Sequence, residues 1–206
     1  MIKELVIKLI EHDITKHQNK YVIYVTQVTQ CLRKSYYEIK HKVVNVDYEL
    51  SKHLILGKSI HLWLQDLLKR YGNELNIKYC IEKDIKFMHR GYMIKGRADI
   101  VINDVLVELK TTHKSIHLPD RMHVLQANEY AYQLGLQKYV ILYVTPNGLI
   151  EFKFTTDRYK HFIFIHRLET LIDALEMDEL PEKETGYECK YCPFRNKCLY
   201  RKLIHK

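Results

Sequence analysis

The sequence predicts an α/β fold in which a mixed sheet is flanked by helices. Its 206 residues are enough for one domain with a hydrophobic core, and 47% of them are apolar. Helix-like and strand-like patterns alternate along the chain, which is typical of a mixed α/β sheet. We therefore expect a single domain over residues 1–206, with a helical N-terminal segment at about 1–50 and a short tail at about 181–206.

The individual elements follow from hydrophobic periodicity, because helices repeat every three to four residues and strands every two. Thr26 is a typical cap and predicts a short helix that runs through Cys31 to about Glu38. The expected helices span about 1–13, 26–38, 50–71, 122–134 and 158–177. The expected strands span 79–87, 92–102, 105–110, 139–144 and 149–154. Asn103-Asp104 and Pro146-Asn147-Gly148 are expected to form turns.

Composition and charge exclude several classes of protein. No apolar run approaches the ~20 residues of a membrane helix, and the first residues do not resemble a signal peptide. Five cysteines in a lysine-rich chain without a secretory signal indicate a reducing compartment, so we expect a cytoplasmic protein without a membrane partner. The net charge of +8 favours a polyanionic partner such as nucleic acid, though charge alone favours it only slightly.

The hairpin around Asn103-Asp104 carries a possible catalytic pattern. A two-residue turn there places Asp99 directly opposite Glu108, and Glu108 and Lys110 project to the same side of their strand. Two facing carboxylates repel each other, and bound Mg²⁺ or Mn²⁺ would remove that conflict. Lys110 would then stabilise charge on a phosphate or orient the attacking water. The alternative, of equal weight on these residues alone, is a solvated strand face with an ordinary Glu108–Lys110 pair.

Three cysteines near the C-terminus have the spacing of metal ligands. Cys189, Cys192 and Cys198 offer three thiolates to one centre, and Cys31 is the candidate for a fourth. Four thiolates suit either structural zinc or an iron–sulfur cluster, and their spacing does not separate the two. Unrelated reduced cysteines are the less favoured alternative, given the compact spacing. Cys80 lies on an apolar strand and is expected to be a small core residue.

The hairpin and its surroundings resemble the RecB-type branch of the PD-(D/E)xK (restriction-endonuclease-like) nuclease superfamily. The matching segments are Gly57-Lys58-Ser59-Ile60-His61, Gly96-Arg97-Ala98-Asp99, Glu108-Leu109-Lys110 and Gln126-Ala127-Asn128-Glu129-Tyr130. The resemblance implies a metal-dependent active site made of Asp99, Glu108 and Lys110. It also implies that His61 and the main-chain carbonyl of Leu109 are further ligands of the metal.

The remaining residues of this pattern are expected to guide DNA. The resemblance implies that Gln126 and Tyr130, which share a helix face, line the active site beside the DNA. Arg97 and Lys95 share the strand face of Asp99 and are secondary candidates for DNA contact. Each auxiliary residue has a simpler interpretation: His61 as a histidine satisfied in the core, and the pair on the later helix as polar rim positions.

The order of the motifs narrows the resemblance. Cys31 followed by Arg33 and Tyr36-Tyr37, then the nuclease motifs and the cysteine triplet, resembles the CRISPR-associated RecB-like exonuclease family over about residues 24–200. The resemblance implies a [4Fe-4S] cluster, although some members are reported with a smaller one. That cluster would tie the N-terminal segment to the C-terminal tail. Its implied ligands are Cys31, Cys189, Cys192 and Cys198.

The family implies a 5′→3′ exonuclease that requires Mg²⁺ or Mn²⁺ and degrades single-stranded DNA during CRISPR adaptation. CRISPR integration proteins and a second copy of the chain are further candidate partners, in the cytoplasm of a prokaryote or of a prokaryote infected by a virus. Two alternatives stay open. One is a RecB-like nuclease for viral or cellular recombination and repair, and the other is a non-cleaving iron–sulfur scaffold subunit that binds DNA.

Overall fold

The structure is a computed structural model, and it describes residues 2–15, 21–41 and 48–200. Its helices are α1 (Ile2–Thr15), α2 (Val25–Val28), α3 (Leu32–His41), α4 (Tyr48–Tyr71), α5 (Arg121–Gln133), α6 (Arg158–Met177) and α7 (Arg195–Tyr200), with a 3-10 helix η1 (Tyr187–Lys190). Its strands are β1 (Val22–Tyr24), β2 (Tyr79–His89), β3 (Tyr92–Ile102), β4 (Val105–Thr111), β5 (Lys138–Thr145) and β6 (Gly148–Thr155). Within these ranges, every helix is too short or too polar to cross a membrane.

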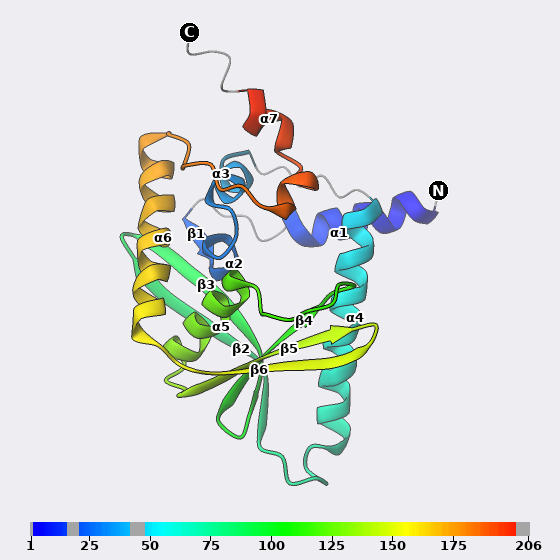
Figure 1. Cartoon of the computed structure of the whole chain (residues 1–206). Helices are drawn as coiled ribbons and strands as arrows, with labels where there is room; N and C mark the ends of the chain where they lie inside the picture. The colour runs from blue at the N-terminus through cyan, green and yellow to red at the C-terminus, as the bar shows by residue number, and fades with distance from the viewer. Residues whose placement is uncertain (1, 16–20, 42–47, 201–206) are drawn as a thin grey trace.

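The strands form one mixed sheet, which confirms the predicted α/β architecture (Figure 1). β4 and β5 run parallel, whereas β2–β3, β3–β4 and β5–β6 are antiparallel pairs. β3 is the branching strand. β2 pairs along one of its edges, while β1 and β4 share the other edge, at residues 93–95 and 100–102 respectively. β3 and β4 therefore separate on the Asp99 side of the Ile100–Val107 pair, and we call this point the fork. The predicted catalytic residues lie there.

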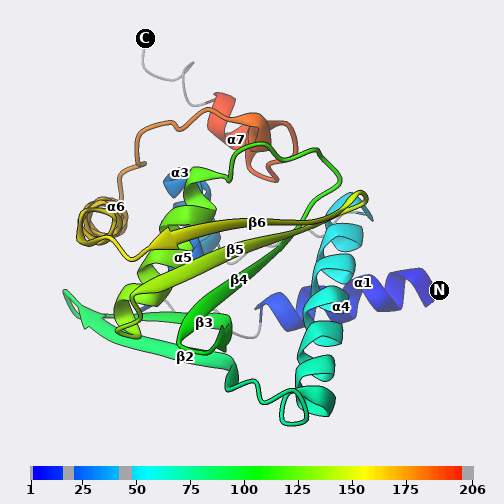
Figure 2. The ribbon, with the colours of Figure 1, turned by 60° about the horizontal axis from the view of Figure 1, so that its bottom comes forward.

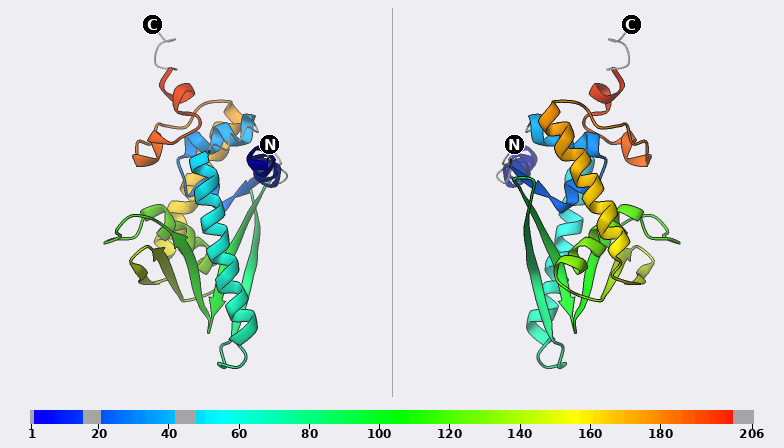
Figure 3. Two further views of the ribbon diagram at one scale, coloured as in Figure 1. Left: turned by 90° about the vertical axis from the view of Figure 1, so that its right-hand side faces the viewer. Right: turned by 90° about the vertical axis from the view of Figure 1, so that its left-hand side faces the viewer.

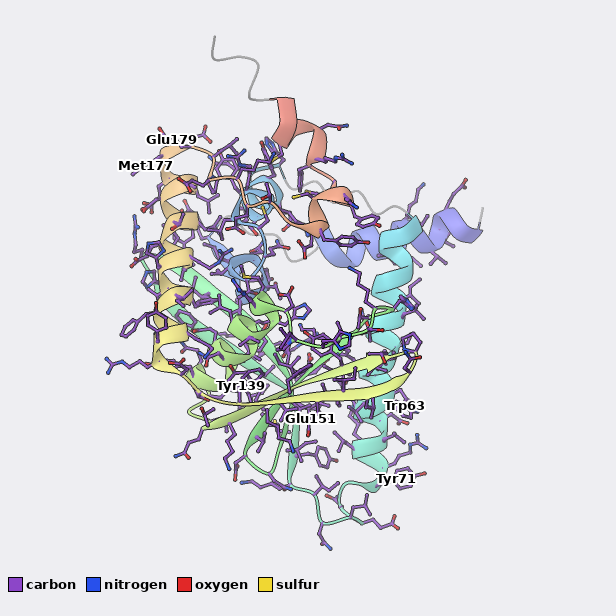
Figure 4. All side chains as sticks on the ribbon, viewed as in Figure 1. Trp63, Tyr71, Tyr139, Glu151, Met177 and Glu179 are labelled. Carbon is purple, nitrogen blue, oxygen red and sulfur yellow. The ribbon has the colours of Figure 1, made fainter. Side chains whose placement is uncertain are left out.

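The helices cover the sheet unevenly. α5 packs on the sheet between β5 and α6, whereas α4 stands at the other end and contacts β4 (Figure 2). Trp63 and Tyr71 lie along exposed parts of α4, across the molecule from Met177 and Glu179 near the end of α6 (Figure 4).

The hydrophobic core lies where the strands, α5 and α6 meet. Its fully buried side chains include Ile94, Leu106, Tyr139, Ile141, Phe164 and Leu168.

The N-terminal and C-terminal segments meet beside the end of α6, where α3 lies next to η1 and α7 (Figures 1 and 3). Arg167 of α6 donates from Nε to the carbonyl of Val28 (2.9 Å) and from Nη2 to that of Gln30 (2.7 Å). Arg33 of α3 donates from Nε to the carbonyl of Pro181 (2.9 Å). Guanidinium groups thus hold the two distant segments against each other with hydrogen bonds that need no metal.

The prediction of one helix from Thr26 to about Glu38 is wrong, because the chain makes two helices there. The first begins after Tyr24, whose main-chain N–H donates to Gln27 Oε1 (2.9 Å), so Thr26 lies inside α2. Cys31 comes directly before α3 rather than within a helix. The preceding strand β1 was also missed, since three residues that pair only with a distant strand leave little local pattern.

The prediction that Cys80 belongs to the core is wrong, because its side chain is exposed. β2 lies at an edge of the sheet, and Cys80 shares its strand face with Asp84 and Lys86, both exposed. The opposite face carries the buried Ile85. The alternation of the sequence contained this signal, since the charged residues four and six positions after Cys80 mark the solvent face of the strand.

Candidate functional site

The hairpin between β3 and β4 has the predicted register. Asn103 and Asp104 both have positive φ (47° and 62°), as a two-residue type I′ turn requires. The last ladder pair is Ile100 with Val107, so the next step faces Asp99 toward Glu108. The fork between the strands therefore begins at these two carboxylates.

Asp99 itself bridges the fork. Its Oδ2 accepts a hydrogen bond from the main-chain N–H of Leu109 (2.9 Å), which takes the place of a ladder bond between the strands. Its other oxygen, Oδ1, lies 3.4 Å from Nδ1 of His61 on α4. Burial opposes protonation of His61, but the hydrogen bond and negative charge of Asp99 outweigh it and raise the pKa of the imidazole. His61 is thus half-buried against a carboxylate rather than enclosed in the apolar core.

Glu108 is 2% exposed, and this burial excludes the solvated strand face. Lys110 Nζ donates to Glu108 Oε1 (2.9 Å) and to Gln126 Oε1 (2.8 Å). Burial raises the pKa of Glu108 to about 7, although the charge of Lys110 acts in the opposite direction. For Lys110 burial acts to lower the pKa, but Glu108 outweighs it, so the ammonium is kept. We call Asp99, Glu108 and Lys110 together with His61 the carboxylate site.

Gln126 and Tyr130 of α5 are brought to this site and are buried, so their interpretation as polar rim positions is wrong. Gln126 Nε2 donates to Tyr130 Oη (3.1 Å), while its oxygen accepts from Lys110. A Cβ atom at Gly96 of β3 would lie only 2.6 Å from Tyr130 Cε1, so the phenol ring needs a glycine there. Gln126 thus holds the ammonium of Lys110, and Tyr130 holds the amide of Gln126.

Arg97 is not brought into contact with the carboxylate site. Its side chain is exposed, and Nη1 lies 3.2 Å from Glu82 Oε2 on β2. Glu82 has an unusual positive φ of 53° for a non-glycine residue. Lys95 is half-buried two residues earlier on β3. Arg97 thus remains available at the surface near the fork, as one side of an exposed ion pair.

Two residues near Lys110 were missed from the sequence. Tyr143 of β5 is aligned with Lys110 in the parallel ladder, and its Oη lies 2.8 Å from Nδ1 of His123 on α5. The same oxygen accepts from the main-chain N–H of Asp120 (3.1 Å). Burial, with the charge of Lys110, lowers the pKa of His123 to about 4. The available signal was the spacing, since position 123 precedes Gln126 by one helical turn.

The carboxylate site has a donor set suited to a divalent cation. Glu108 Oε2 is buried and has no hydrogen-bond partner among the described residues, and an orphaned carboxylate oxygen is costly unless a cation or water satisfies it. Carboxylate and imidazole groups are typical ligands of Mg²⁺ and Mn²⁺. Across residues 2–15, 21–41 and 48–200, no three such side chains are already closed around a common point. The residue types suit a divalent metal, but in the described residues they do not yet form a complete coordination shell.

The four predicted cysteines lie around one cavity of about 200 Å³, which we call the cysteine cavity. The cysteines that line it are Cys31, Cys189, Cys192 and Cys198. They come from the two ends of the chain, and Cys80 is not among them. Burial raises the pKa of the Cys192 thiol, and the neighbouring Cys31 and Cys189 act in the same direction.

The surroundings of the cysteine cavity are basic and aromatic. Arg33 Nη1 lies 3.8 Å from Cys198 Sγ, and the ring of Tyr37 stacks on that of Phe194 at 5.2 Å. Basic side chains on its walls are Arg33, Lys34, Lys183, Lys190 and Arg195. The charge of Lys34 opposes the rise in the Cys192 pKa but does not outweigh burial. As they lie in residues 2–15, 21–41 and 48–200, no three cysteines are gathered closely enough to hold a metal. Four thiols around one cavity are nevertheless the donor set that a thiolate-bound centre requires.

Comparisons with known proteins agree with these features. No family model matches the chain. A CRISPR-associated exonuclease Cas4 from Saccharolobus solfataricus is 29% identical, over 96% of this chain and 98% of that protein. The crystal structure of the protein SSO0001 is 27% identical with a TM-score of 0.72, covering 98% of this chain and 97% of that one. An alkaline exonuclease from Laribacter hongkongensis, LHK-Exo, is 10% identical with a TM-score of 0.53, covering 76% and 88% respectively.

These likenesses confirm two of the predictions made from the sequence. The similarity over nearly the whole chain confirms the resemblance to the CRISPR-associated RecB-like exonucleases. The mixed sheet and its flanking helices, shared with the structure of SSO0001 and at low sequence identity with LHK-Exo, confirm the predicted α/β fold. The fold thus agrees with the motifs, and the fork at Asp99 and Glu108 lies where the motifs predict an active site.

Proposed function

We propose that this relative of the CRISPR-associated exonucleases is itself a metal-dependent DNA nuclease. The observation that carries the proposal is the buried Glu108, facing Asp99 and held by Lys110, with one carboxylate oxygen left without a partner in the described chain. A protein that used this strand pair only as scaffold would gain stability by replacing such a group with an apolar one. A buried carboxylate paired with a lysine where two strands separate is therefore better explained by catalysis.

The proposed metal is Mg²⁺ or Mn²⁺, held by His61, Asp99, Glu108 and the main-chain carbonyl of Leu109. When bound, such a metal supplies an attacking water of lowered pKa and neutralises charge on the scissile phosphate. Asp99 is fixed by the N–H of Leu109, so one of its oxygens is already oriented. The Asp99 carboxylate in turn orients His61.

Lys110 has the role of stabilising developing negative charge on the phosphate or holding the attacking water. Its ammonium is fixed by Glu108 and Gln126, so little reorganisation is needed when charge develops. Tyr130 supports Gln126 from the buried side, and in this proposal both act by positioning the lysine beside the DNA. Surplus basic residues supply salt-dependent affinity for the DNA backbone.

Cys31, Cys189, Cys192 and Cys198 are the proposed ligands of a [4Fe-4S] cluster with a structural role. Their common cavity and its basic walls support this assignment. The cluster would link the N-terminal segment to the tail, close to the contacts made by Arg33 and Arg167. The substrate we propose is single-stranded DNA, digested from its 5′ end during CRISPR adaptation, with CRISPR integration proteins as partners.

The test is a gel assay with end-labelled single-stranded DNA and protein purified without oxygen. We expect cleavage in Mn²⁺, no cleavage in EDTA, and none by Asp99→Ala in either condition. Strands labelled separately at the 5′ and 3′ ends reveal the direction of digestion. Salt-sensitive DNA binding without cleavage by the folded, iron-loaded protein would contradict the nuclease and favour the scaffold alternative. Cleavage that persists in Asp99→Ala would remove the carboxylate site as its origin.

A further inference from the structure

His123 lies beside the carboxylate site but has no part in the chemistry proposed so far. It precedes Gln126 by three residues on α5, so the two side chains share a helix face. That face packs on β4 and β5, the strands of Lys110 and Tyr143. His123 therefore extends the row formed by Gln126 and Tyr130 by one turn toward the start of the helix.

The hydrogen bonds of Tyr143 determine the state of the imidazole. Its hydroxyl oxygen accepts from the N–H of Asp120, and within the described chain Nδ1 of His123 is the acceptor in contact with the hydroxyl hydrogen. The hydroxyl therefore donates to Nδ1, and the single ring hydrogen of the neutral imidazole lies on Nε2. The lowered pKa of His123 agrees with a neutral ring.

The opposite nitrogen, Nε2–H, is then a donor without a partner in the part of the chain that the structure describes. The ring is half-buried and its other nitrogen contacts Tyr143, so this donor is not free to turn in solvent. Tyr143 and Lys110 are aligned in the parallel ladder, so their side chains lie on the same face of the sheet. A neutral donor next to a fixed ammonium suits an anionic acceptor.

We propose that His123 binds the substrate strand by donating from Nε2 to a phosphate oxygen beside the phosphate that Lys110 engages. Tyr143 is the positioning residue, because its hydroxyl holds the imidazole in the tautomer that presents this donor. The inference rests on the proposed nuclease function and adds a residue to its DNA-binding wall. Since the donor is neutral, its contribution to binding differs from that of the lysines and arginines in not depending on salt.

The experiment compares His123→Phe, which keeps the ring and its packing, with wild type and with His117→Phe, a matched change at an exposed histidine of the preceding loop. Cleavage of oligothymidine in Mn²⁺ is measured across substrate and salt concentrations. Binding of the same DNA is measured in EDTA. Loss of a hydrogen bond to a charged group is expected to raise KM and Kd by about tenfold, with kcat changed less than about twofold.

Two further readouts separate binding from a structural role. The slope of log Kd against log salt should stay unchanged in His123→Phe, whereas loss of a cationic phosphate contact lowers it by about 1. Tyr143→Phe should reproduce the rise in KM, and the double variant should be no worse than either single variant, because both remove one interaction. His123→Gln, which keeps an N–H donor, should recover part of the affinity.

The outcomes are distinct. Wild-type protein that neither binds nor cleaves the oligonucleotide overturns the proposed function and this inference together. Wild-type cleavage with unchanged KM in His123→Phe overturns only the inference. A loss confined to kcat also overturns it, since the residue would then act on the reaction step. If His123→Phe does not fold, Tyr143→Phe carries the test by the same criteria.

Discussion

The carboxylate site and the cysteine cavity are assembled over very different distances along the chain. Asp99, Glu108 and Lys110 belong to one hairpin, and a short turn sets their register. In the cysteine cavity, Arg33 contacts Cys198 across 165 residues. These three residues of the carboxylate site depend on a local ladder, whereas the cysteine cavity depends on two chain segments staying docked. Damage to the docked segments should therefore leave the hairpin geometry intact, and the reverse should also hold.

The largest expected effect is on cleavage in Lys110→Ala. Removal of the fixed ammonium should lower the cleavage rate by ~10²-fold or more, because it withdraws charge stabilisation from the reacting phosphate. The visible absorption expected from the proposed cluster should not change, since the cysteine cavity is built from other segments. The control is Lys153→Ala, an exposed lysine paired with Glu151 on β6. Loss of both cleavage and visible absorption would mean that the two regions are not separable.

The next largest effect is expected for Cys31→Ala. Bound iron should fall to background, and the melting temperature should drop by several degrees, because ~1 kcal/mol corresponds to roughly 2–4 °C in a domain of this size. Cys80→Ala is the matched control, since that thiol is exposed and outside the cavity. Iron analysis and thermal unfolding measure the two effects. Full iron content and unchanged stability in Cys31→Ala would remove this residue as a ligand.

Arg167→Met tests the contacts that join the N-terminal and C-terminal segments without a metal. The guanidinium bonds to Val28 and Gln30 and pairs with Glu184, so its loss should lower the free energy of unfolding by about 2–4 kcal/mol. Arg70→Met is the control, because that arginine forms an exposed pair with Asp66 on α4. Denaturant unfolding measures both variants. Equal stabilities would indicate that the Arg167 contacts do not hold the two segments together.

The smallest effect is a pH dependence carried by His123. Its folded pKa, about 4, is below the ordinary value of 6.5, so the unfolded chain takes up the proton first as pH falls. The resulting stability is present above pH 6.5 and decreases toward pH 4. Between pH 7 and 5, wild type should lose about 1–2 kcal/mol relative to His123→Gln. Denaturant unfolding at each pH measures the free energy of unfolding of both proteins. An equal change for wild type and His123→Gln would contradict a depressed pKa of His123.

The same contrast explains what could be predicted from the sequence. The register of the hairpin followed from its turn residues, and the facing of Asp99 and Glu108 followed from the register. These are short-range rules. The burial of Glu108 was not predictable in the same way, because it depends on α5 packing over β4, and the two segments share no local pattern.

Other features were missed for the same physical reason. Strand β1 pairs with residues about 70 positions later, and only that tertiary contact makes its three residues a strand. Thr26 has the propensity of a cap, but Gln27 provides the hydrogen bond at the start of α2 through its contact with Tyr24. The alignment of Tyr143 with Lys110 comes from a parallel pairing across a helix, which single-sequence patterns do not specify.

Gly96 has no side chain and takes part in no reaction, yet the ring of Tyr130 occupies the space where its Cβ would lie. Any larger residue there pushes the phenol outward, and through Gln126 it displaces the ammonium of Lys110. Under the proposed function, a lineage that exchanges this glycine for alanine should therefore lose cleavage while it keeps all the proposed catalytic residues. Inspection of the catalytic motif alone would then misidentify an inactive descendant as an enzyme.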